Sequence, residues 1–136
     1  MESVARLHRH VRRTSLPYLP DLHTPEEDLA FFRNRVFPAA EVWLAESEAE
    51  LAGFAAVREG WLDHLYVSPS RHGRGIGSAL LVRAKEGRRQ LDLWTFQANG
   101  QARRFYERRG FRLAELTDGS ANEERVPDAR YRWVDD

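Results

Sequence analysis

Apolar and polar residues follow two different periods along the chain, which predicts a mixture of helices and strands. Over residues 3–14, Val4, Leu7 and Val11 recur at helical spacing among basic residues. This spacing predicts an amphipathic helix near the N-terminus. A loop containing two prolines follows and ends that helix.

The second predicted helix starts after Thr24 and runs to about Phe37. Thr24 is a typical N-cap residue, and Pro25 follows it in the first turn together with acidic residues. Its expected buried positions are Leu29, Phe32 and Val36.

Six segments rich in apolar, β-branched and aromatic residues predict strands. They cover residues 41–46, 51–58, 61–67, 91–97, 111–116 and 129–134. Two further helices are predicted at 78–86 and 101–109, and a glycine follows each of them. The order of these elements predicts an α+β fold with helices on both faces of a sheet.

The composition fits one domain over residues 1–136, because 42% hydrophobic residues can furnish a single core. The 21 basic and 21 acidic residues give zero formal charge, so neither a nucleic-acid nor a membrane partner is expected. The lack of cysteine excludes disulfides and a cysteine nucleophile. With no recognisable signal peptide and no apolar run of about 18 residues, a cytoplasmic location is expected.

A glycine-rich turn follows the predicted strand at 61–67. The segment His72-Gly73-Arg74-Gly75-Ile76-Gly77 separates that strand from the helix expected to begin at Ser78. At such a junction, backbone N–H groups and the positive end of the helix dipole converge on one point. The turn is therefore predicted to bind an anion such as a phosphate group.

Three interpretations compete for this turn. A Walker-type phosphate loop requires a lysine after its last glycine, whereas Ser78 follows Gly77 directly. A dinucleotide fingerprint requires a third glycine at the position that Ser78 occupies, and an acidic residue about 20 residues further on. The third interpretation also accounts for a second segment downstream.

Two groups of residues flank the turn in a recognisable order. Leu65-Tyr66-Val67 form an apolar-aromatic-valine triplet at the end of the preceding strand. The downstream group consists of Asn99, Ala102, Phe105, Tyr106, Gly110 and Phe111. Together with the turn, these residues closely resemble the GNAT superfamily of acyl-CoA-dependent N-acetyltransferases, over about residues 41–116.

The resemblance implies acetyl-CoA as cosubstrate, no metal ion, and a mixed, mostly antiparallel sheet that splays between the strands at 61–67 and 91–97. In the family, backbone amides of the turn wrap the pyrophosphate, and an amide near Tyr66 or Val67 polarises the thioester carbonyl. Asn99 is implied to bind the pantetheine arm, to cap a helix, or both. The implied cofactor-binding residues are Leu65, Tyr66, Val67, His72, Gly73, Arg74, Gly75, Ile76, Gly77, Ser78, Asn99, Ala102 and Phe105.

The sequence departs from the family pattern in two places. His72 stands where the family usually has glutamine or arginine, and an arginine is displaced to Arg71. The family also begins with a strand before its first helix, and this strand is expected to be absent here. The resulting free sheet edge would favour pairing into a homodimer.

Acetyl transfer requires a neutral amine, yet an alkyl amine with a pKa near 10.4 is mostly protonated at neutral pH. A general base is therefore expected. Asp63 and His64 are the candidates, and because neighbouring strand residues face opposite sides, at most one of them points at the cleft. The alternatives are Glu46, a chain of water molecules and, for His64, a purely structural hydrogen-bonded role.

By resemblance, Tyr106 is the general acid that protonates the departing thiolate. The alternative is that Tyr106 packs with Phe105 beneath the sheet. The resemblance also implies direct transfer in a ternary complex with both substrates bound.

The acceptor is expected to be an amine on a small molecule or a peptide. In the family two loops wall the acceptor site, which here means Tyr18, Leu19, Asp21, His23 and the loop at 117–128. Asp21, Glu123 and Glu124 could attract a cationic amine.

Other classes of site and protein remain as alternatives. His8, His10 and His23 lack further ligands at metal spacing, so no metal site is expected. Arg71 and Arg74 either face solvent or contact the phosphates of CoA. The rival functions are a CoA-binding domain that senses or scaffolds without turnover, and a nucleotide-binding module.

Overall fold

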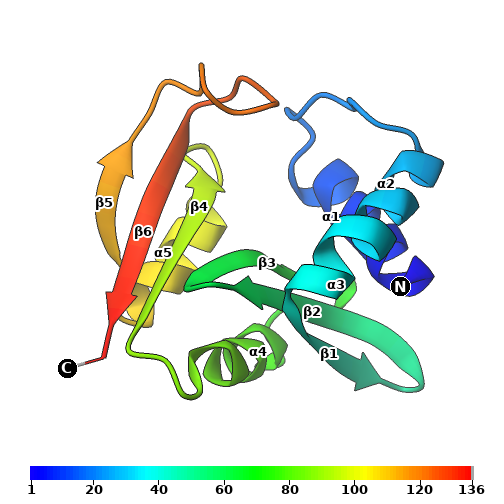
Figure 1. Ribbon diagram of the computed structural model, residues 1–136, viewed down its shortest axis with the longest axis horizontal. Helices are drawn as coiled ribbons and strands as arrows, with labels where there is room; N and C mark the ends of the chain where they lie inside the picture. The colour runs from blue at the N-terminus through cyan, green and yellow to red at the C-terminus, as the bar shows by residue number, and fades with distance from the viewer. Residues whose placement is uncertain (136) are drawn as a thin grey trace. The chain divides into compact units, whose positions relative to one another are not determined.

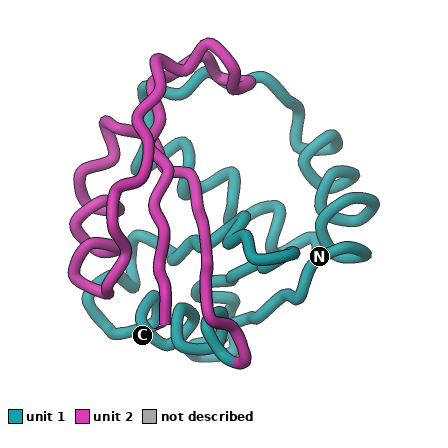
Figure 2. The backbone as a smooth tube through the Cα atoms, turned by 60° about the vertical axis from the view of Figure 1, so that its left-hand side comes forward, with its two compact units in different colours: residues 1–86 teal, residues 87–136 magenta. Residues whose placement is uncertain are grey.

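A computed structural model describes residues 1–135, and the chain divides into two compact units (Figure 2). Unit 1 comprises Met1–Glu86 and unit 2 comprises Gly87–Asp136. The elements of unit 1 are α1 (Glu2–Ser15), α2 (Pro25–Phe31), the π-helix η1 (Phe32–Val36), α3 (Phe37–Ala39), β1 (Glu41–Ser47), β2 (Glu50–Arg58), β3 (Trp61–Val67), the 3₁₀ turn η2 (Pro69–Arg71) and α4 (Ile76–Lys85). Those of unit 2 are β4 (Gln90–Phe96), α5 (Gly100–Arg108), β5 (Arg112–Leu116) and β6 (Asp128–Val134).

The helix predicted after Thr24 begins with a complete capping box. The Thr24 hydroxyl accepts a hydrogen bond from the Glu27 N–H at 3.2 Å, and the Glu27 carboxylate accepts one from the Thr24 N–H at 2.9 Å. Past Phe31 the helical path continues through η1 and ends at Ala39, two residues beyond the prediction. The sequence pattern did not reveal the π-helical segment, a rare conformation that often adjoins functional sites.

The three strands of unit 1 form an antiparallel sheet in the order β1-β2-β3. A two-residue turn joins β1 to β2, with positive φ angles of 55° at Glu48 and 65° at Ala49. Such turns match the right-handed twist of the flanking strands. Between Ala56 and Val57 the β2–β3 register shifts, which marks a bulge.

Helices cover both faces of this sheet, as predicted (Figure 1). On one face, Phe54 and Ala56 of β2 belong to the same buried cluster as Val4 and Val11 of α1. On the other face, a Cβ at Gly53 would lie 3.1 Å from the Leu80 side chain of α4. Glycine at this position therefore lets α4 pack closely against the sheet.

The three strands of unit 2 pair antiparallel in the order β4-β6-β5. Tyr131 of β6 is fully buried, and its hydroxyl donates to the Glu107 carboxylate of α5 at 2.6 Å. The same hydroxyl accepts a hydrogen bond from Arg103 at 3.0 Å. These contacts fix α5 against β6, so that one face of the sheet is covered by this helix.

On the opposite face of the unit 2 strands, a buried carboxylate pairs with two arginines. Asp92 of β4 is 5% exposed and accepts hydrogen bonds from the guanidinium groups of Arg130 and Arg132 at 2.8–3.1 Å. These partners lower the pKa of the Asp92 carboxyl, with the hydrogen bond from Arg132 contributing most.

The structure confirms the α+β class and the antiparallel pairing within each unit. One boundary prediction was wrong: α4 begins at Ile76 rather than Ser78, so Gly77 lies inside the helix and not in the turn. Gly75 adopts a left-handed conformation and the helix starts directly after it. The single domain and the splay between the strands at 61–67 and 91–97 stay predictions.

Candidate active site

The glycine turn presents open backbone at the start of α4. Gly73 and Gly75 have φ angles of 80° and 78°, a region that side chains disfavour. A Cβ added at either glycine would meet no described atom within 4 Å, so the space beside this backbone is open. Gly75 occupies the N-cap position, and the first intrahelical bond runs from the Ala79 N–H to its carbonyl at 3.0 Å. This geometry suits a pyrophosphate, because amides at a helix N-terminus bind anions.

Two hydrogen bonds hold the turn against the sheet. The Ser68 N–H donates to the Ala52 carbonyl of β2 at 2.8 Å. The His72 ring, through Nε2, donates to the Val67 carbonyl at the end of β3 at 3.1 Å. The His72 side chain, which departs from the family pattern, therefore holds the turn to the end of β3.

The side chain of Arg71 is engaged within the fold. Its guanidinium lies 3.1 Å from the Glu50 carboxylate, and the side chain is 13% exposed. Arg71 therefore contacts Glu50, the first residue of β2. Neither of the two predictions for Arg71, exposure to solvent or contact with a CoA phosphate, included this contact.

The triplet before the turn divides between the two faces of β3. Tyr66 stacks on Phe54 with ring centroids 5.7 Å apart and meets His8 of α1 edge-on at 4.8 Å. Leu65 and Val67 have the opposite parity and pair with Ala55 and Gly53. The backbone of β3 is thereby fixed from both sides at the position where a carbonyl-polarising amide is expected.

Asp63 and His64 both line one pocket of unit 1. Its volume is about 640 Å³, and its wall also includes Phe31, Arg58 and Ala40. Which of them points at the acyl-CoA cleft, Asp63 or His64, stays a prediction. Asp63 lies at the bulge of the β2–β3 pairing, because His64 pairs with Ala56 and Leu62 pairs with Val57. Bulges change the direction of side chains relative to a regular strand.

The Asp63 carboxylate is partly buried and paired. It lies 3.0 Å from the Arg58 guanidinium, and its side chain is 29% exposed. Burial raises the pKa of the Asp63 carboxyl, and the hydrogen bond and charge of Arg58 oppose that rise. A carboxylate with a raised pKa is a better proton acceptor than an ordinary aspartate.

His64 of β3 lies in a cluster of rings. Phe32 and His8 lie 5.3 and 5.5 Å away between ring centroids. The Nδ1 atoms of His64 and His8 are buried and lack hydrogen-bond partners within residues 1–135. Burial and then the charge of Arg12 lower the pKa of His64 to about 4. Burial, followed by His64 and Arg12, lowers the pKa of His8 to about 3.

Glu46 lies elsewhere in unit 1. Glu46 is exposed on β1 and does not line the Asp63–His64 pocket. The geometry of unit 1 therefore places Asp63 and His64 in one pocket and Glu46 outside it.

In unit 2 the predicted residues gather on α5. Asn99 caps this helix, because its side-chain oxygen accepts from the Ala102 N–H at 3.2 Å, which confirms the predicted cap. Tyr106 is 8% exposed and packs edge-on against Phe105 and Phe111, with ring centroids 5.3 and 5.4 Å apart. The predicted packing of Tyr106 with Phe105 is thus present, and the role of its hydroxyl stays a prediction.

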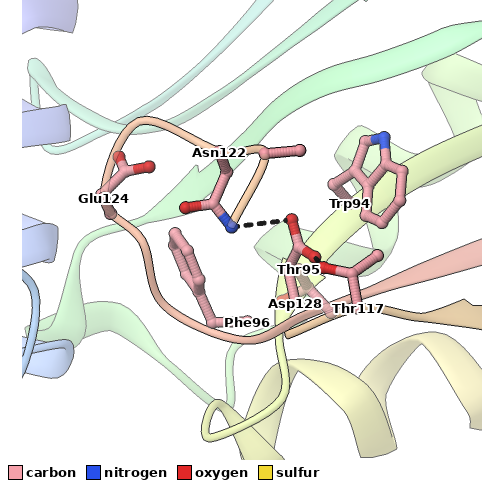
Figure 3. A pocket seen from close by; sticks show the side chains of 8 residues that line it. Trp94, Thr95, Phe96, Thr117, Asn122, Glu124 and Asp128 are labelled. Atoms are coloured by element: carbon pink, nitrogen blue, oxygen red, sulfur yellow. Dashed lines mark hydrogen bonds between the residues drawn. The ribbon is translucent and has the colours of Figure 1, made fainter. Parts of the chain in front are cut away.

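Sequence reasoning missed two features of the molecule. One is the ring cluster of His8 and His64, for which the only signal was the helical spacing of His8 with Val4 and Val11. The other is the aromatic part of a pocket in unit 2, where Trp94 and Phe96 lie beside the loop at 117–128 that the sequence had already indicated (Figure 3). No group of three His, Cys, Asp or Glu side chains within residues 1–135 could hold a metal ion.

The family of this chain follows from comparison with known proteins. The family described as "Acetyltransferase (GNAT) domain" matches residues 38–113, more than half of the 136 residues. The chain therefore belongs to the GNAT acetyltransferase family. Within residues 1–135, no helix is both long enough and apolar enough to cross a membrane.

Relatives of known sequence and structure agree with this family. The chain is 32% identical over 84 residues to peptidyl-lysine N-acetyltransferase YiaC of Escherichia coli strain K12, covering 61% of this chain and 58% of YiaC. It is 31% identical over 123 residues to an uncharacterized N-acetyltransferase of Archaeoglobus fulgidus, covering 71% and 83%. The crystal structure of PaiA N-acetyltransferase from Thermoplasma acidophilum in complex with coenzyme A gives a TM-score of 0.67 at 20% identity, covering 98% and 91%. The chain thus spans less than two thirds of the length of YiaC.

Proposed function

We propose that this chain transfers the acetyl group of acetyl-CoA to a primary amine within a ternary complex. The observation that carries the proposal is the glycine turn at the N-terminus of α4, with open space beside Gly73 and Gly75. Its backbone amides would bind the pyrophosphate, and Asn99, Ala102 and Phe105 would contact the rest of the cosubstrate. The CoA complex of the PaiA enzyme, which shares the fold, supports this choice of cosubstrate.

Asp63 is the proposed general base. It lines a pocket, and burial raises the pKa of its carboxyl. When the amine nitrogen attacks the thioester carbonyl, a nitrogen–carbon bond forms and the nitrogen loses a proton to Asp63. The nearby guanidinium of Arg58, 3.0 Å from Asp63, keeps the resting carboxylate ionised at neutral pH.

Tyr106 is the proposed general acid. As the carbon–sulfur bond breaks, the thiolate of CoA would receive the phenolic proton of Tyr106. A phenol has an ordinary pKa of about 10, and the conjugate acid of the thiolate has a pKa of about 8.5. The phenol is the weaker acid, so the proton would be transferred while the thiolate is forming and lies close to the hydroxyl. The rigid packing of Tyr106 against Phe105 and Phe111 would fix the position of its hydroxyl.

The acceptor is proposed to be an alkyl amine. The name of YiaC, a peptidyl-lysine N-acetyltransferase, supports a lysine side chain as one member of this class. Free small-molecule amines have the same reacting group, so the panel of acceptors must include both.

The test is a thiol-release assay with purified protein, acetyl-CoA and a panel of free amines and lysine-containing peptides. We expect release that depends on the amine, and acetylated product by mass spectrometry. Tyr106→Phe should lower kcat about 10- to 1,000-fold without unfolding the protein, because phenylalanine preserves the ring contacts. Binding of acetyl-CoA without turnover across the panel would instead indicate a CoA-binding sensor, and no binding at millimolar CoA would contradict both.

A further inference from the structure

One wall of the Asp63–His64 pocket is a single face of a helix. Four lining residues recur at three- or four-residue spacing along the helical path from α2 through η1 to α3 (Figure 1). They are Phe31, Asn34, Arg35 and Pro38. Residues at this spacing lie on the same side of a helix. The strands contribute Arg58 of β2 and Asp63 and His64 of β3, so the whole pocket belongs to unit 1.

The segment that bears Asn34 and Arg35 has an unusual backbone conformation and is anchored in the core. At the end of η1 the Phe37 N–H donates to the Phe32 carbonyl five residues earlier, as in a π-helix. Phe32 is fully buried and Val36 is 7% exposed, and both belong to the core cluster of unit 1. Single π-helical turns occur frequently at functional sites. A wall whose backbone is fixed also loses little conformational freedom when a ligand binds.

The charged side chains that line the pocket do not balance. They are Arg35, Arg58 and Asp63. His64 also lines the pocket, but burial lowers its pKa to about 4, so its ring is neutral at pH 7. One positive charge is therefore left without a negative counterpart in the wall. A ligand with a negatively charged group would compensate it.

Arg35 is the arginine that is available to such a ligand. The guanidinium of Arg58 is already paired, because it lies 3.0 Å from the Asp63 carboxylate and 3.6 Å from that of Glu59. Arg35 is exposed, and no acidic side chain within residues 1–135 forms an ion pair with it. A guanidinium can donate two parallel hydrogen bonds to a carboxylate. The side-chain amide of the preceding residue, Asn34, can donate a further one.

From this arrangement we infer that the acceptor carries a carboxylate, which Arg35 and Asn34 bind while the reacting amine faces Asp63. An amine beside the acid of the pocket and a carboxylate beside its unpaired arginine form the charge pattern of an amino acid. The volume of about 640 Å³ lies in the usual range of small-molecule sites. This substrate class rests on the proposed function, but binding can be tested without transfer.

The binding experiment compares amines with and without a carboxylate, in the presence of CoA, which has no acetyl group to transfer. L-norleucine and 6-aminohexanoate both become pentylamine when the carboxylate is removed. We expect at least one of these amino acids to bind more tightly than pentylamine, with saturable shifts of the Asn34 and Arg35 backbone N–H signals in NMR spectra. A peptide blocked at both ends with the sequence Lys-Asp, compared with Lys-Asn, tests an acidic peptide as the source.

Two neighbouring arginines provide a matched pair of variants. Arg35→Gln should weaken the binding of the carboxylate-bearing ligand about 3- to 30-fold, between the range of an exposed ion pair and that of a charge-assisted hydrogen bond. Arg35→Lys keeps the charge and should retain part of the affinity. Arg33→Gln removes the same charge from an exposed residue of η1 that does not line the pocket, and it should leave the affinity unchanged.

The kinetic experiment uses the same acceptors with acetyl-CoA. We expect a lower KM for L-norleucine or 6-aminohexanoate than for pentylamine if the source is a free amino acid, or for the Lys-Asp than for the Lys-Asn peptide if it is a peptide. Arg35→Gln should remove this difference, and Arg33→Gln should preserve it.

The outcomes separate the two proposals. Equal effects of Arg33→Gln and Arg35→Gln, or no preference for a carboxylate in either the free or the peptide series, would overturn this inference. Transfer to amines without that preference would leave the proposed function standing. Binding that requires both the carboxylate and Arg35, in a protein that acetylates no amine, would sustain the carboxylate site and refute the proposed function.

Discussion

The glycine turn and the Asp63–His64 pocket belong to the same unit but are built in different ways. The turn uses backbone amides of residues consecutive in the chain, with glycines at φ angles near 80°. The pocket uses side chains from η1, β2 and β3, which only the fold brings together. A site made of backbone can be recognised in a sequence, because the requirement for glycine is local. A site made of side chains depends on neighbours that are distant in the sequence.

The largest effect is expected in the side-chain pocket. Asp63→Asn should lower kcat/KM about 100- to 10,000-fold at neutral pH, because it removes the proposed base. The loss should shrink as the pH approaches the amine pKa, where the acceptor is already neutral. Initial rates of thiol release between pH 6 and 10 measure both effects.

The pH profile of the unmodified protein provides a further check of Asp63. Since burial raises the pKa of the Asp63 carboxyl, the acidic limb of kcat/KM should lie above the ordinary aspartate value of about 3.9. Arg58→Gln removes the opposing charge and should move this limb to still higher pH. An Asp63→Asn protein with the rate and profile of the parent would remove Asp63 from the mechanism.

The glycine turn can be tested with a matched pair of substitutions. Gly75 and Gly60 have φ angles of 78° and 83°, and a Cβ at either would meet no described atom within 4 Å. Gly75→Ala and Gly60→Ala should therefore destabilise the protein similarly, by about 1–2 kcal/mol each. Only Gly75→Ala should raise the KM for acetyl-CoA, by about 10- to 100-fold, because it displaces amides that bind phosphate. Equal KM values would show that the turn does not bind the cosubstrate.

The buried histidines predict how stability depends on pH. Their folded-state pKa values, about 3 for His8 and about 4 for His64, lie below the ordinary value of about 6.5. Between these values the unfolded chain binds protons that the folded chain does not. The stabilisation is therefore complete above pH 6.5 and is lost as the pH falls towards about 4 for His64 and about 3 for His8.

This effect amounts to about 1.4 kcal/mol per pH unit for each histidine that is protonated only in the unfolded state. Denaturant unfolding at pH 7, 6 and 5 measures it. His8→Phe combined with His64→Phe should flatten the dependence, whereas His10→Gln at an exposed position should not. A parent protein equally stable at pH 7 and 5 would contradict the burial of both rings as neutral groups.

The smallest effect is expected at His72. His72→Ala removes the hydrogen bond to the Val67 carbonyl and should raise the KM for acetyl-CoA about 3- to 10-fold, the range of one neutral hydrogen bond. His72→Gln keeps an N–H donor and should restore part of the affinity, while kcat stays the same in both. A change in kcat with constant KM would show that His72 acts on the chemistry and not on the shape of the turn.

The sequence by itself determined the elements, the caps and the family. The α+β order, the capping box at Thr24 and the cap at Asn99 follow from periodicity and from short-range hydrogen bonding, so they can be recognised without knowing the fold. The spacing of the glycine turn and of Asn99 and Tyr106 was sufficient to indicate a GNAT acetyltransferase, which the family match confirmed.

Only the tertiary structure decided the surroundings of the side chains. Asp63 and His64 line one pocket beside the bulge at Ala56–Val57, and ring packing from three segments lowers the pKa of His64. The contact of Arg71 with Glu50, and the pocket of Trp94 and Asp128, likewise join residues far apart in the chain. Backbone conformation is set largely by a residue and its neighbours, but burial, charge and the direction of a side chain depend on residues that folding brings close.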